Sequence, residues 1–353
     1  MARSVFKGIK IRGIAGAVPL MRVDNRTDHL FCSEEDRKKI VDLTGVPEYR
    51  KAPAHLCASD LCVAAAQELL QGLQENAKSI DGIIFSTMTP DYRVPSTACV
   101  IQDRLKCSTE VVAYDINMGC SGYVVGLYNA CALIQGGGLQ RVLLLAGDTQ
   151  TKLCHAQDKN VAFILGDGGT ATLLEAGKDN DEITIELMTD GSRFRNLYVP
   201  AGGFRRPSDE SSRQIRERPD GGLRADDNLY MNGMEIFKFS STDVVRSLAG
   251  FMESGGLTPA QLDYLFLHQA NKFMNDKIAS KLKFPKEKVP YSIGVYGNTG
   301  SASIPLTITH HLSLHESCGK RRSLLCGFGV GLSWGVADVV LDDIYTPPVI
   351  ECS

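Results

Sequence analysis

Three side chains of the kinds that carry out acyl transfer stand far apart in the sequence, and the first is Cys120. It lies in the run Gly-Cys-Ser-Gly, after an apolar segment at 111–116, and apolar residues recur at helical spacing from 120 to 133. A thiol at the start of a helix lies at the positive end of the helix dipole, which predicts a lowered pKa and a nucleophilic thiolate. The alternative is a core cysteine, because free cysteine is among the most buried residue types.

The other two side chains are His268 and Asn298. His268 directly follows a short strand pattern at 262–267, and Asn271 is the predicted N-cap of the helix that comes next. Asn298 lies in a glycine-flanked turn ahead of another predicted helix. Taken singly, each fits a structural histidine or a turn residue. A cysteine, a histidine and an asparagine that all lie at element junctions together favour acyl transfer through a thioester.

The elements that must position these residues alternate between strand and helix along the chain. This alternation predicts layered α/β structure with mostly covered sheets. A segment rich in Gly, Arg, Asp and Ser at 202–227 predicts a long loop or flap. The predicted strands are 80–87, 111–116, 141–146, 162–174, 262–267, 323–328 and 335–341, and the predicted helices are 59–73, 96–105, 120–135, 231–253 and 271–282.

Composition limits the class of protein. A length of 353 residues predicts two domains or a duplicated unit, and 43% hydrophobic residues suffice for a large core. A net charge of −3 without a long basic run argues against nucleic acid as the main partner. Eleven irregularly spaced cysteines fit neither a disulfide scaffold nor a zinc site and indicate a reducing compartment. Residues 1–13 lack a signal-peptide pattern, so we expect a soluble, cytoplasmic protein.

The motifs around these residues resemble those of β-ketoacyl-ACP synthase III (ACP, acyl-carrier protein), a condensing enzyme of the thiolase superfamily. The ordered series covers nearly the whole chain and is more specific than any single glycine loop. It comprises Asn-Met-Gly-Cys-Ser-Gly around Cys120, His268-Gln269-Ala270-Asn271, Gly297-Asn298-Thr299, Thr89-Pro90-Asp91-Tyr92, Pro95-Ser96-Thr97-Ala98, Gly166-Asp167-Gly168-Gly169-Thr170-Ala171, and Phe328-Gly329-Val330-Gly331 with Trp334-Gly335.

The resemblance implies a thiolase-like fold of five αβαβα layers. Two similar halves would make up this fold, residues 1–176 with Cys120 and residues 177–353 with His268 and Asn298. The sequence itself shows no clear internal repeat. The resemblance also implies a homodimer in which the loop carrying Val94 reaches the partner's site.

The resemblance further implies a decarboxylating Claisen condensation. Cys120 would hold an acyl group as a thioester, and the backbone N–H groups of Cys120 and Val330 would form the oxyanion hole. His268 and Asn298 would stabilise the enolate left when a malonyl thioester, expected to be malonyl-ACP, loses CO₂. The product would be a β-ketoacyl thioester of fatty-acid or secondary-metabolite synthesis. No metal or prosthetic group is implied; the implied partners are acyl-carrier protein and coenzyme A thioesters.

The sequence departs from the family pattern where substrates enter. The tryptophan and arginine that hold the coenzyme A nucleotide in typical members are replaced by Lys39 and Leu43. A basic residue tied to carrier docking is replaced by Phe273, and Lys272 beside it is the candidate substitute. Val94 replaces a bulky aromatic at the end of the acyl pocket, which predicts a longer or branched acyl group. These departures favour a specialised member over the housekeeping enzyme.

Further substrate contacts and competing functions remain open at this point. The predicted pocket walls are Met231 and Phe237, each of which also fits plain core, and Phe328 is a further predicted substrate contact. Arg205 and Arg206 in the predicted flap are candidate contacts for an acidic carrier or a pyrophosphate, against a simple solvated loop. The competing functions are an acyltransferase that does not decarboxylate and a noncatalytic carrier-binding subunit. Asn298 counts against the first, and Cys120 counts against the second.

Overall fold

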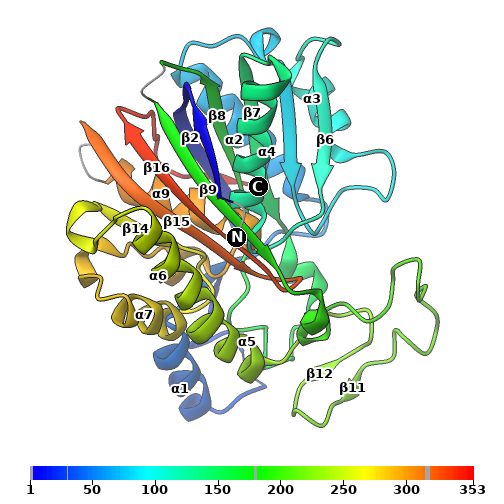
Figure 1. Ribbon diagram of the computed structural model, residues 1–353. Helices are drawn as coiled ribbons and strands as arrows, with labels where there is room; N and C mark the ends of the chain where they lie inside the picture. Colours follow the sequence, from blue (N-terminus) through cyan, green and yellow to red (C-terminus); the bar gives the residue numbers. More distant parts are fainter. Residues whose placement is uncertain (1–2, 30, 179–180, 315–318) are drawn as a thin grey trace.

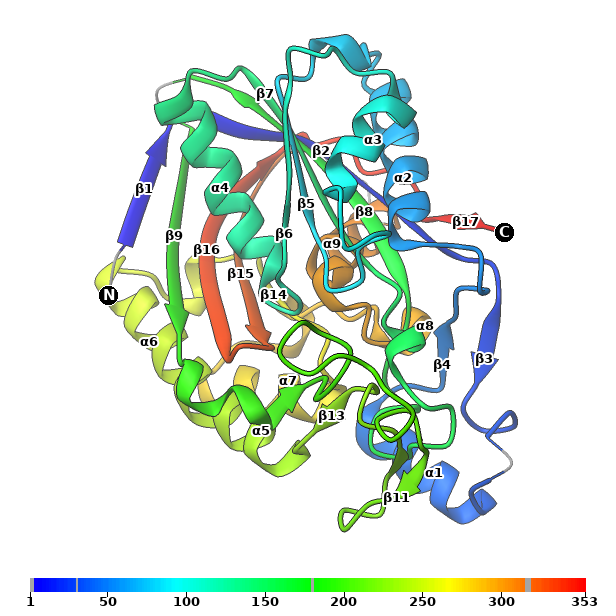
Figure 2. The same cartoon turned by 90° about the vertical axis from the view of Figure 1, so that its right-hand side faces the viewer.

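The computed structural model describes residues 3–29, 31–178, 181–314 and 319–353. Within them, two main sheets lie one behind the other (Figures 1 and 2). The first sheet has the strand order β17-β2-β8-β7-β5-β6 and the second β1-β9-β16-β15-β14. Their bounds are β1 Arg3–Lys7, β2 Ile9–Pro19, β5 Gly82–Ser86, β6 Val112–Ile116, β7 Arg141–Asp148, β8 Gly168–Ala176, β9 Glu182–Thr189, β14 Tyr264–Leu267, β15 Lys320–Gly329, β16 Ser333–Asp342 and β17 Ile350–Cys352.

Helices cover both sheets and fill the space between them. The pair α2 (Ala58–Gly72) and α3 (Thr97–Leu105) packs on the outer face of the first sheet. The pair α4 (Gly122–Gly137) and α9 (Ser303–Ser313) lies between the sheets (Figure 2). The outer face of the second sheet is covered by α5 (Gly233–Phe239), α6 (Val245–Ser254) and α7 (Lys272–Lys281). The predicted αβαβα layering is therefore confirmed.

Shorter elements complete the chain. A π turn at Ser240–Val244 joins α5 to α6. The short helices and strands are α1 Glu34–Thr44, α8 Ile293–Tyr296, β3 Arg22–Asp24, β4 Glu48–Arg50, β10 Leu197–Tyr198, β11 Arg216–Glu217, β12 Leu223–Arg224 and β13 Tyr230–Met231. The 3-10 turns are Ala77–Ser79, Gln150–Leu153, Gly191–Asn196, Pro259–Gln261, Lys286–Lys288 and Gly300–Ala302. Of the described helices, none is both long and apolar enough to cross a membrane.

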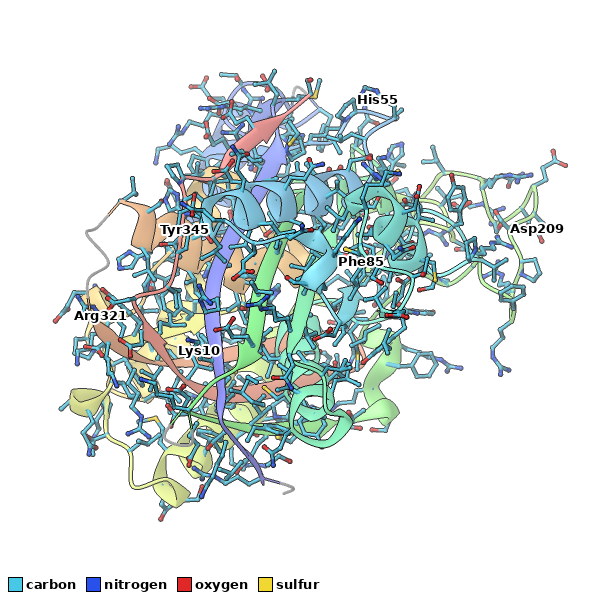
Figure 3. The ribbon with its side chains drawn as sticks, turned by 90° about the horizontal axis from the view of Figure 1, so that it is seen from above. Lys10, His55, Phe85, Asp209, Arg321 and Tyr345 are labelled. Carbon is cyan, nitrogen blue, oxygen red and sulfur yellow. The ribbon has the colours of Figure 1, made fainter. Side chains whose placement is uncertain are left out.

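The central strands of the first sheet are apolar along their whole length because helices cover both faces. In β5, every residue is buried, and Phe85 lies inside the molecule (Figure 3). The strands β6, β5 and β7 run parallel, so their carboxyl ends lie at one edge of the sheet. In the same way, α4 is apolar on most of its surface because it packs between two sheets.

Helix ends follow the predictions more closely than strand ends do. Asn271 caps α7, and its side chain accepts a hydrogen bond from the Met274 N–H at 2.8 Å. The predicted strand at 162–174 is wrong in its first part, because β8 begins only at Gly168. The residues before it form a turn in which the Gly166 N–H donates to the Asn298 carbonyl at 2.8 Å. The backbone of this segment therefore binds the Asn298 turn and does not extend the sheet.

The first and the last described strands lie in different sheets, each away from the strands next to it in sequence. The strand β1 pairs with β9 in the second sheet, and β17 pairs with β2 in the first. Between these ends the chain passes from the first sheet in β8 to the second in β9. The division into halves at 176 and 177 stays a prediction.

The segment 202–227 forms a flap that projects from the body of the molecule (Figure 1). It contains the small antiparallel hairpin of β11 and β12, and Asp209 lies far out on it (Figure 3). The predicted flap is therefore present, although no sequence pattern indicated the hairpin within it.

Candidate active site

Cys120 lies in the turn between β6 and α4, as the sequence predicts. The Gly122 N–H closes this turn by donating to the Gly119 carbonyl at 2.7 Å, and Cys120 is only 8% exposed. Strand β15 passes close to the thiol, since a Cβ on Gly329 would lie 2.7 Å from the Cys120 Sγ. Only glycine lets the strand approach the candidate nucleophile this closely.

The thiol lies in an environment that opposes its ionisation. Burial raises the pKa of Cys120 to about 11, and the nearby Asp148 charge acts in the same direction. The backbone N–H groups of Val330 and Cys120 reach the thiol and lower its pKa, but by less than burial raises it. The expected lowering of the pKa is therefore wrong, because burial raises the pKa by more than the nearby donors lower it. The two N–H groups are the predicted oxyanion donors.

A pH profile tests this environment. Because the thiolate is the reactive form, we expect alkylation of Cys120 by iodoacetamide to rise about tenfold per pH unit from pH 6 to 9. The rate would be followed by mass spectrometry of the peptide that carries Cys120. A plateau near pH 7 would contradict this prediction, because it would mean that a cation holds the thiolate in the resting protein.

His268 lies directly after β14, at the same edge as the end of β15. The two strands run parallel, and the His268 N–H donates to the Cys326 carbonyl at 2.9 Å. The imidazole meets the Phe328 ring edge to face, with centroids 5.5 Å apart, and its Nδ1 lies 2.7 Å from the Ser303 Oγ. Burial lowers the pKa of His268 to about 3, against the opposing effect of the Gly300 carbonyl. The ring is therefore neutral at physiological pH.

Asn298 is held by its backbone and by its side chain. Its N–H donates to the Ile164 carbonyl at 2.8 Å, and its Oδ1 accepts from the Gly300 N–H at 3.0 Å. The second bond fixes the amide with its oxygen toward Gly300, so the amide nitrogen faces the other way. Gly300 has a φ of +61°, and a Cβ there would collide with the Asp148 carboxylate. A glycine is required at this position for both reasons.

Asp148, at the end of β7, is a buried residue that the sequence analysis missed. Its carboxylate accepts from the Met88 N–H at 2.7 Å, the Ser301 N–H at 2.8 Å and the Ser301 Oγ at 2.7 Å, with Thr87 Oγ1 at 3.2 Å. Burial raises its pKa to about 6 although these donors lower it. Asp148 thereby ties the turn after Asn298 to the end of β5. An aspartate that directly follows the apolar run of β7 is a signal that could have identified it.

Strand β15 brings the three candidate segments to one place. Its end lies against Cys120 through Gly329 and against the His268 ring through Phe328. The turn after Asn298 reaches the same histidine through Ser303. The structure thus gathers at the carboxyl ends of β14 and β15 the residue types that thioester chemistry requires.

The predicted substrate contacts lie in different surroundings. Phe328 is buried beside His268. Met231 and Phe237 are partly buried and pack against the hydrophobic cluster to which Phe328 belongs. Phe237 stacks on Phe273 with ring centroids 5.4 Å apart. Val94 is 82% exposed in the single chain. The role of these side chains in binding an acyl group stays a prediction.

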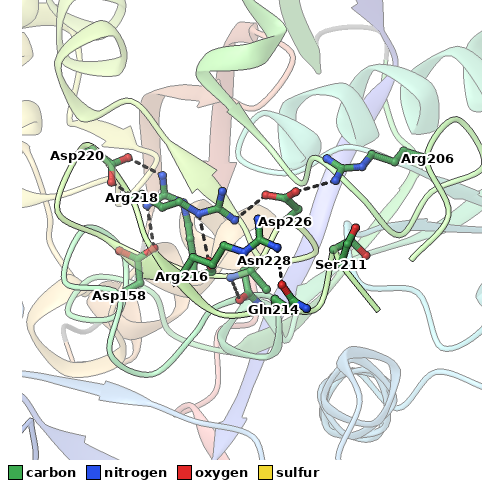
Figure 4. Close-up of polar contacts among 12 residues, drawn as sticks. Asp158, Arg206, Ser211, Gln214, Arg216, Arg218, Asp220, Asp226 and Asn228 are labelled. Carbon is green, nitrogen blue, oxygen red and sulfur yellow. Dashed lines mark hydrogen bonds and ion pairs between the residues drawn. The ribbon is translucent and has the colours of Figure 1, made fainter. Parts of the chain in front are cut away.

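Two of the three predicted carrier contacts form ion pairs with carboxylates of the same chain. The guanidinium of Arg206 pairs with Asp226 at 2.7 Å within the flap (Figure 4), and Lys272 pairs with Asp276 at 2.5 Å. Arg205 is exposed. An anionic ligand would have to compete with an internal carboxylate at Arg206 and at Lys272, so their role stays a prediction.

The flap is fastened by Arg224, which pairs with two carboxylates that Figure 4 labels, Asp158 and Asp220. The side chain of Arg224 is 7% exposed, and that of Asp158 is 1% exposed. Burial raises the pKa of Asp158 although Arg224 lowers it. An Asp158 left without this arginine would be a buried, uncompensated charge, which is strongly destabilising.

Arg224→Ala is therefore expected to loosen the flap. We expect the free energy of local opening to fall by about 3 kcal/mol, so that amides in residues 216–228 exchange with deuterium on the order of a hundredfold faster. The matched control is Arg206→Ala, which removes a half-exposed partner of Asp226 and should cost under about 1 kcal/mol. Equal rates of amide exchange in the two variants would show that Arg224 does not hold the flap in place.

Comparisons with known proteins agree on one family. The family models described as 3-oxoacyl-[acyl-carrier-protein (ACP)] synthase III and its C terminal match residues 114–191 and 252–340. The chain is 35% identical over 326 residues to a beta-ketoacyl-[acyl-carrier-protein] synthase III of Streptococcus equi subsp. zooepidemicus, covering 90% of this chain and 97% of the relative.

Two solved structures extend the similarity to the fold. A 3-oxoacyl-(acyl-carrier protein) synthase from Burkholderia xenovorans LB400 superposes with a TM-score of 0.92 at 37% identity, covering 99% of each chain. The priming beta-ketosynthase from the R1128 polyketide biosynthetic pathway superposes with a TM-score of 0.83 at 25% identity, covering 96% of this chain and 97% of that one.

Proposed function

Because this chain belongs to the 3-oxoacyl-[acyl-carrier-protein] synthase III family, we propose that Cys120, His268 and Asn298 carry out its condensing reaction. The enzyme is an acyltransferase of the thiolase fold that joins an acyl thioester to a malonyl thioester. The observation that carries the proposed roles is the meeting of the three segments at the end of β15.

In the first half-reaction, the Cys120 sulfur attacks the carbonyl carbon of an acyl thioester. The carbonyl oxygen becomes an oxyanion, which the N–H groups of Cys120 and Val330 stabilise, and these are the two groups that reach the resting thiol. The intermediate then expels the carrier thiol, which leaves with the proton that Cys120 loses. The acyl group remains on Cys120 as a thioester.

In the second half-reaction, a malonyl thioester loses CO₂ and leaves an enolate whose negative charge lies on the thioester oxygen. Donors aimed at that oxygen make the loss of CO₂ easier without a metal or a prosthetic group. In the proposal, a ring N–H of the neutral His268 supplies the first donor, and the Ser303 hydroxyl and the Gly300 carbonyl hold the ring in place. The Asn298 amide nitrogen supplies the second donor. The enolate carbon then attacks the acyl-Cys120 carbonyl and expels the Cys120 thiolate, which takes a proton from solvent.

We also propose a homodimer, malonyl-ACP as extender and a cytoplasmic location. Strand β6 is the edge of the first sheet, and an unpaired edge is a template for a strand of a second copy. The exposed Val94 on the neighbouring loop would then be covered. The ten described cysteines are free thiols, which suits a reducing compartment. The departures at Lys39, Leu43 and Phe273 favour a specialised pathway.

Intact-protein mass spectrometry with a panel of acyl-CoAs and acyl-carrier proteins tests the proposal. We expect one acyl group to add to the protein, and a chase with malonyl-ACP to release CO₂ and a product two carbons longer. An adduct that another nucleophile discharges, but malonyl-ACP does not, would instead support the acyltransferase. A protein that forms no adduct across the panel would fit the noncatalytic subunit.

A further inference from the structure

Ser121 and Ser333 form a buried pair of hydroxyls next to the candidate nucleophile. Their Oγ atoms lie 2.6 Å apart, and the two residues are 0% and 3% exposed. Ser121 directly follows Cys120, and Ser333 begins β16 directly after the turn that carries Val330. A buried hydroxyl without a partner is costly, so this pair couples two turns that are distant in the sequence.

The direction of the hydrogen bonds follows from the number of protons. The Ser333 O–H donates to the Val330 carbonyl at 2.7 Å. A hydroxyl has a single proton to donate, so the proton shared by the two serines comes from Ser121. The chain of bonds therefore runs from the Ser121 hydroxyl through the Ser333 hydroxyl to the Val330 carbonyl, and we call it the serine relay.

The side chain of Ser121 does not cap the helix that begins after it. It is the N-cap residue of α4, where a serine Oγ ordinarily accepts a hydrogen bond from a backbone N–H of the first turn. In this structure, the Ser121 side chain makes no capping bond. The hydroxyl is directed across to the second turn instead.

The turn that carries Val330 is held from two sides. On one side, the Leu332 N–H donates to the Asp190 carbonyl at 3.1 Å, and the Asp190 N–H donates back to the Leu332 carbonyl at 2.8 Å. On the other side, the serine relay holds the Val330 carbonyl. The Val330 N–H, one of the two backbone donors that reach the thiol, thus belongs to a residue tied to the neighbour of Cys120.

We propose that the serine relay positions the Val330 N–H at Cys120, so that this donor is in place when the oxyanion forms. The inference rests on the proposed function and adds Ser121 and Ser333 to it as positioning residues. Donors that are fixed before the reaction cost no reorganisation during it, and loss of one slows acyl transfer by about 10²- to 10³-fold. A donor that is displaced, but still present, should cost less than one that is removed.

Two rates at the same sulfur test the proposal. Acylation of Cys120 passes through an oxyanion, whereas alkylation by iodoacetamide does not. Both rates depend on the thiolate, whose pKa the Val330 N–H also lowers, so the ratio of the acylation rate to the alkylation rate is the measure of the oxyanion donors. The acylating reagent is the acyl-CoA that loads the wild-type protein fastest. The variants are Ser333→Ala, Ser121→Ala, the double variant and Ser333→Thr, which keeps the hydroxyl. The matched control is Ser323→Ala, a buried serine of β15 itself.

We expect Ser333→Ala to lower the ratio of the acylation rate to the alkylation rate by about tenfold or more. The double variant should be no slower than Ser333→Ala, because both serines act through one chain of bonds. Ser333→Thr should restore acylation, and Ser323→Ala should change neither rate. A parallel fall of both rates in Ser333→Ala, or an unchanged acylation rate, would overturn the relay. A wild-type protein that alkylates at Cys120 but never acylates would overturn the proposed function itself.

Discussion

Cys120→Ala is expected to abolish the acyl adduct and to lower the rate of condensation by about 10⁴-fold or more. The reason is that the Cys120 sulfur holds the acyl chain in the proposed mechanism, so the two-step route is lost without it. The adduct would be followed by intact-protein mass spectrometry and the product by its mass. Slow release of CO₂ from malonyl-ACP should persist, because His268 and Asn298 remain in place.

The matched control is Cys131→Ala. Cys131 lies on the same helix as the nucleophile turn, is fully buried, and has a pKa that burial raises. It therefore shares the residue type, the helix and the burial of Cys120, but not the two backbone donors. Loss of the adduct in this variant, or its survival in Cys120→Ala, would place the acyl group on a different sulfur.

Asn298→Ala is expected to separate the two half-reactions. Acylation of Cys120 should stay within about twofold of the wild-type rate, whereas condensation should fall by about 10²- to 10³-fold, because one of the two enolate donors is missing. The backbone bonds of Asn298 to Ile164 and Gly166 do not involve its side chain, so the turn keeps its main anchors. Rapid-quench measurement of adduct formation and of CO₂ release gives both rates.

Two further variants sharpen this result. Combined with His268→Ala, Asn298→Ala should cost less than the sum of the two single effects, because both side chains address one oxygen. Asn129→Ala is the control, since the Asn129 amide donates to the Val125 carbonyl of its own helix, at 2.8 Å. A variant Asn298→Ala that slows acylation and condensation equally would show that Asn298 supports the turn and does not stabilise the enolate.

The sequence could place the candidate site residues at junctions between elements because the local signals are strong there. Cys120 and Asn298 lie in glycine-rich turns, and the cap at Asn271 marks the helix that follows His268. Such signals act over a few residues, and the structure shows these residues at the predicted junctions. The layered fold could be predicted for the same reason, since buried strands and amphipathic helices alternate with turn residues between them.

What the sequence could not supply depends on contacts between distant segments. Burial raises the pKa of Cys120, and one of the segments that approach the thiol is β15, some two hundred positions away in the chain. Helix position alone suggested the opposite shift. The strand was predicted to begin before Gly168 because the residues there are apolar. In the structure these residues form a turn that binds the backbone of Asn298. The pairing of Arg224 with Asp158 and the serine relay are likewise invisible without tertiary structure.

The exchange of terminal strands between the two sheets constrains how the chain can fold during translation. The strand β1 has no partner until β9 has been synthesised, and β2 keeps an open edge until β17 emerges from the ribosome. A nascent chain therefore cannot finish its first sheet before its second one has been made. An open strand edge is a site of mispairing, so the interval before β17 arrives is when the nascent chain most needs protection from aggregation.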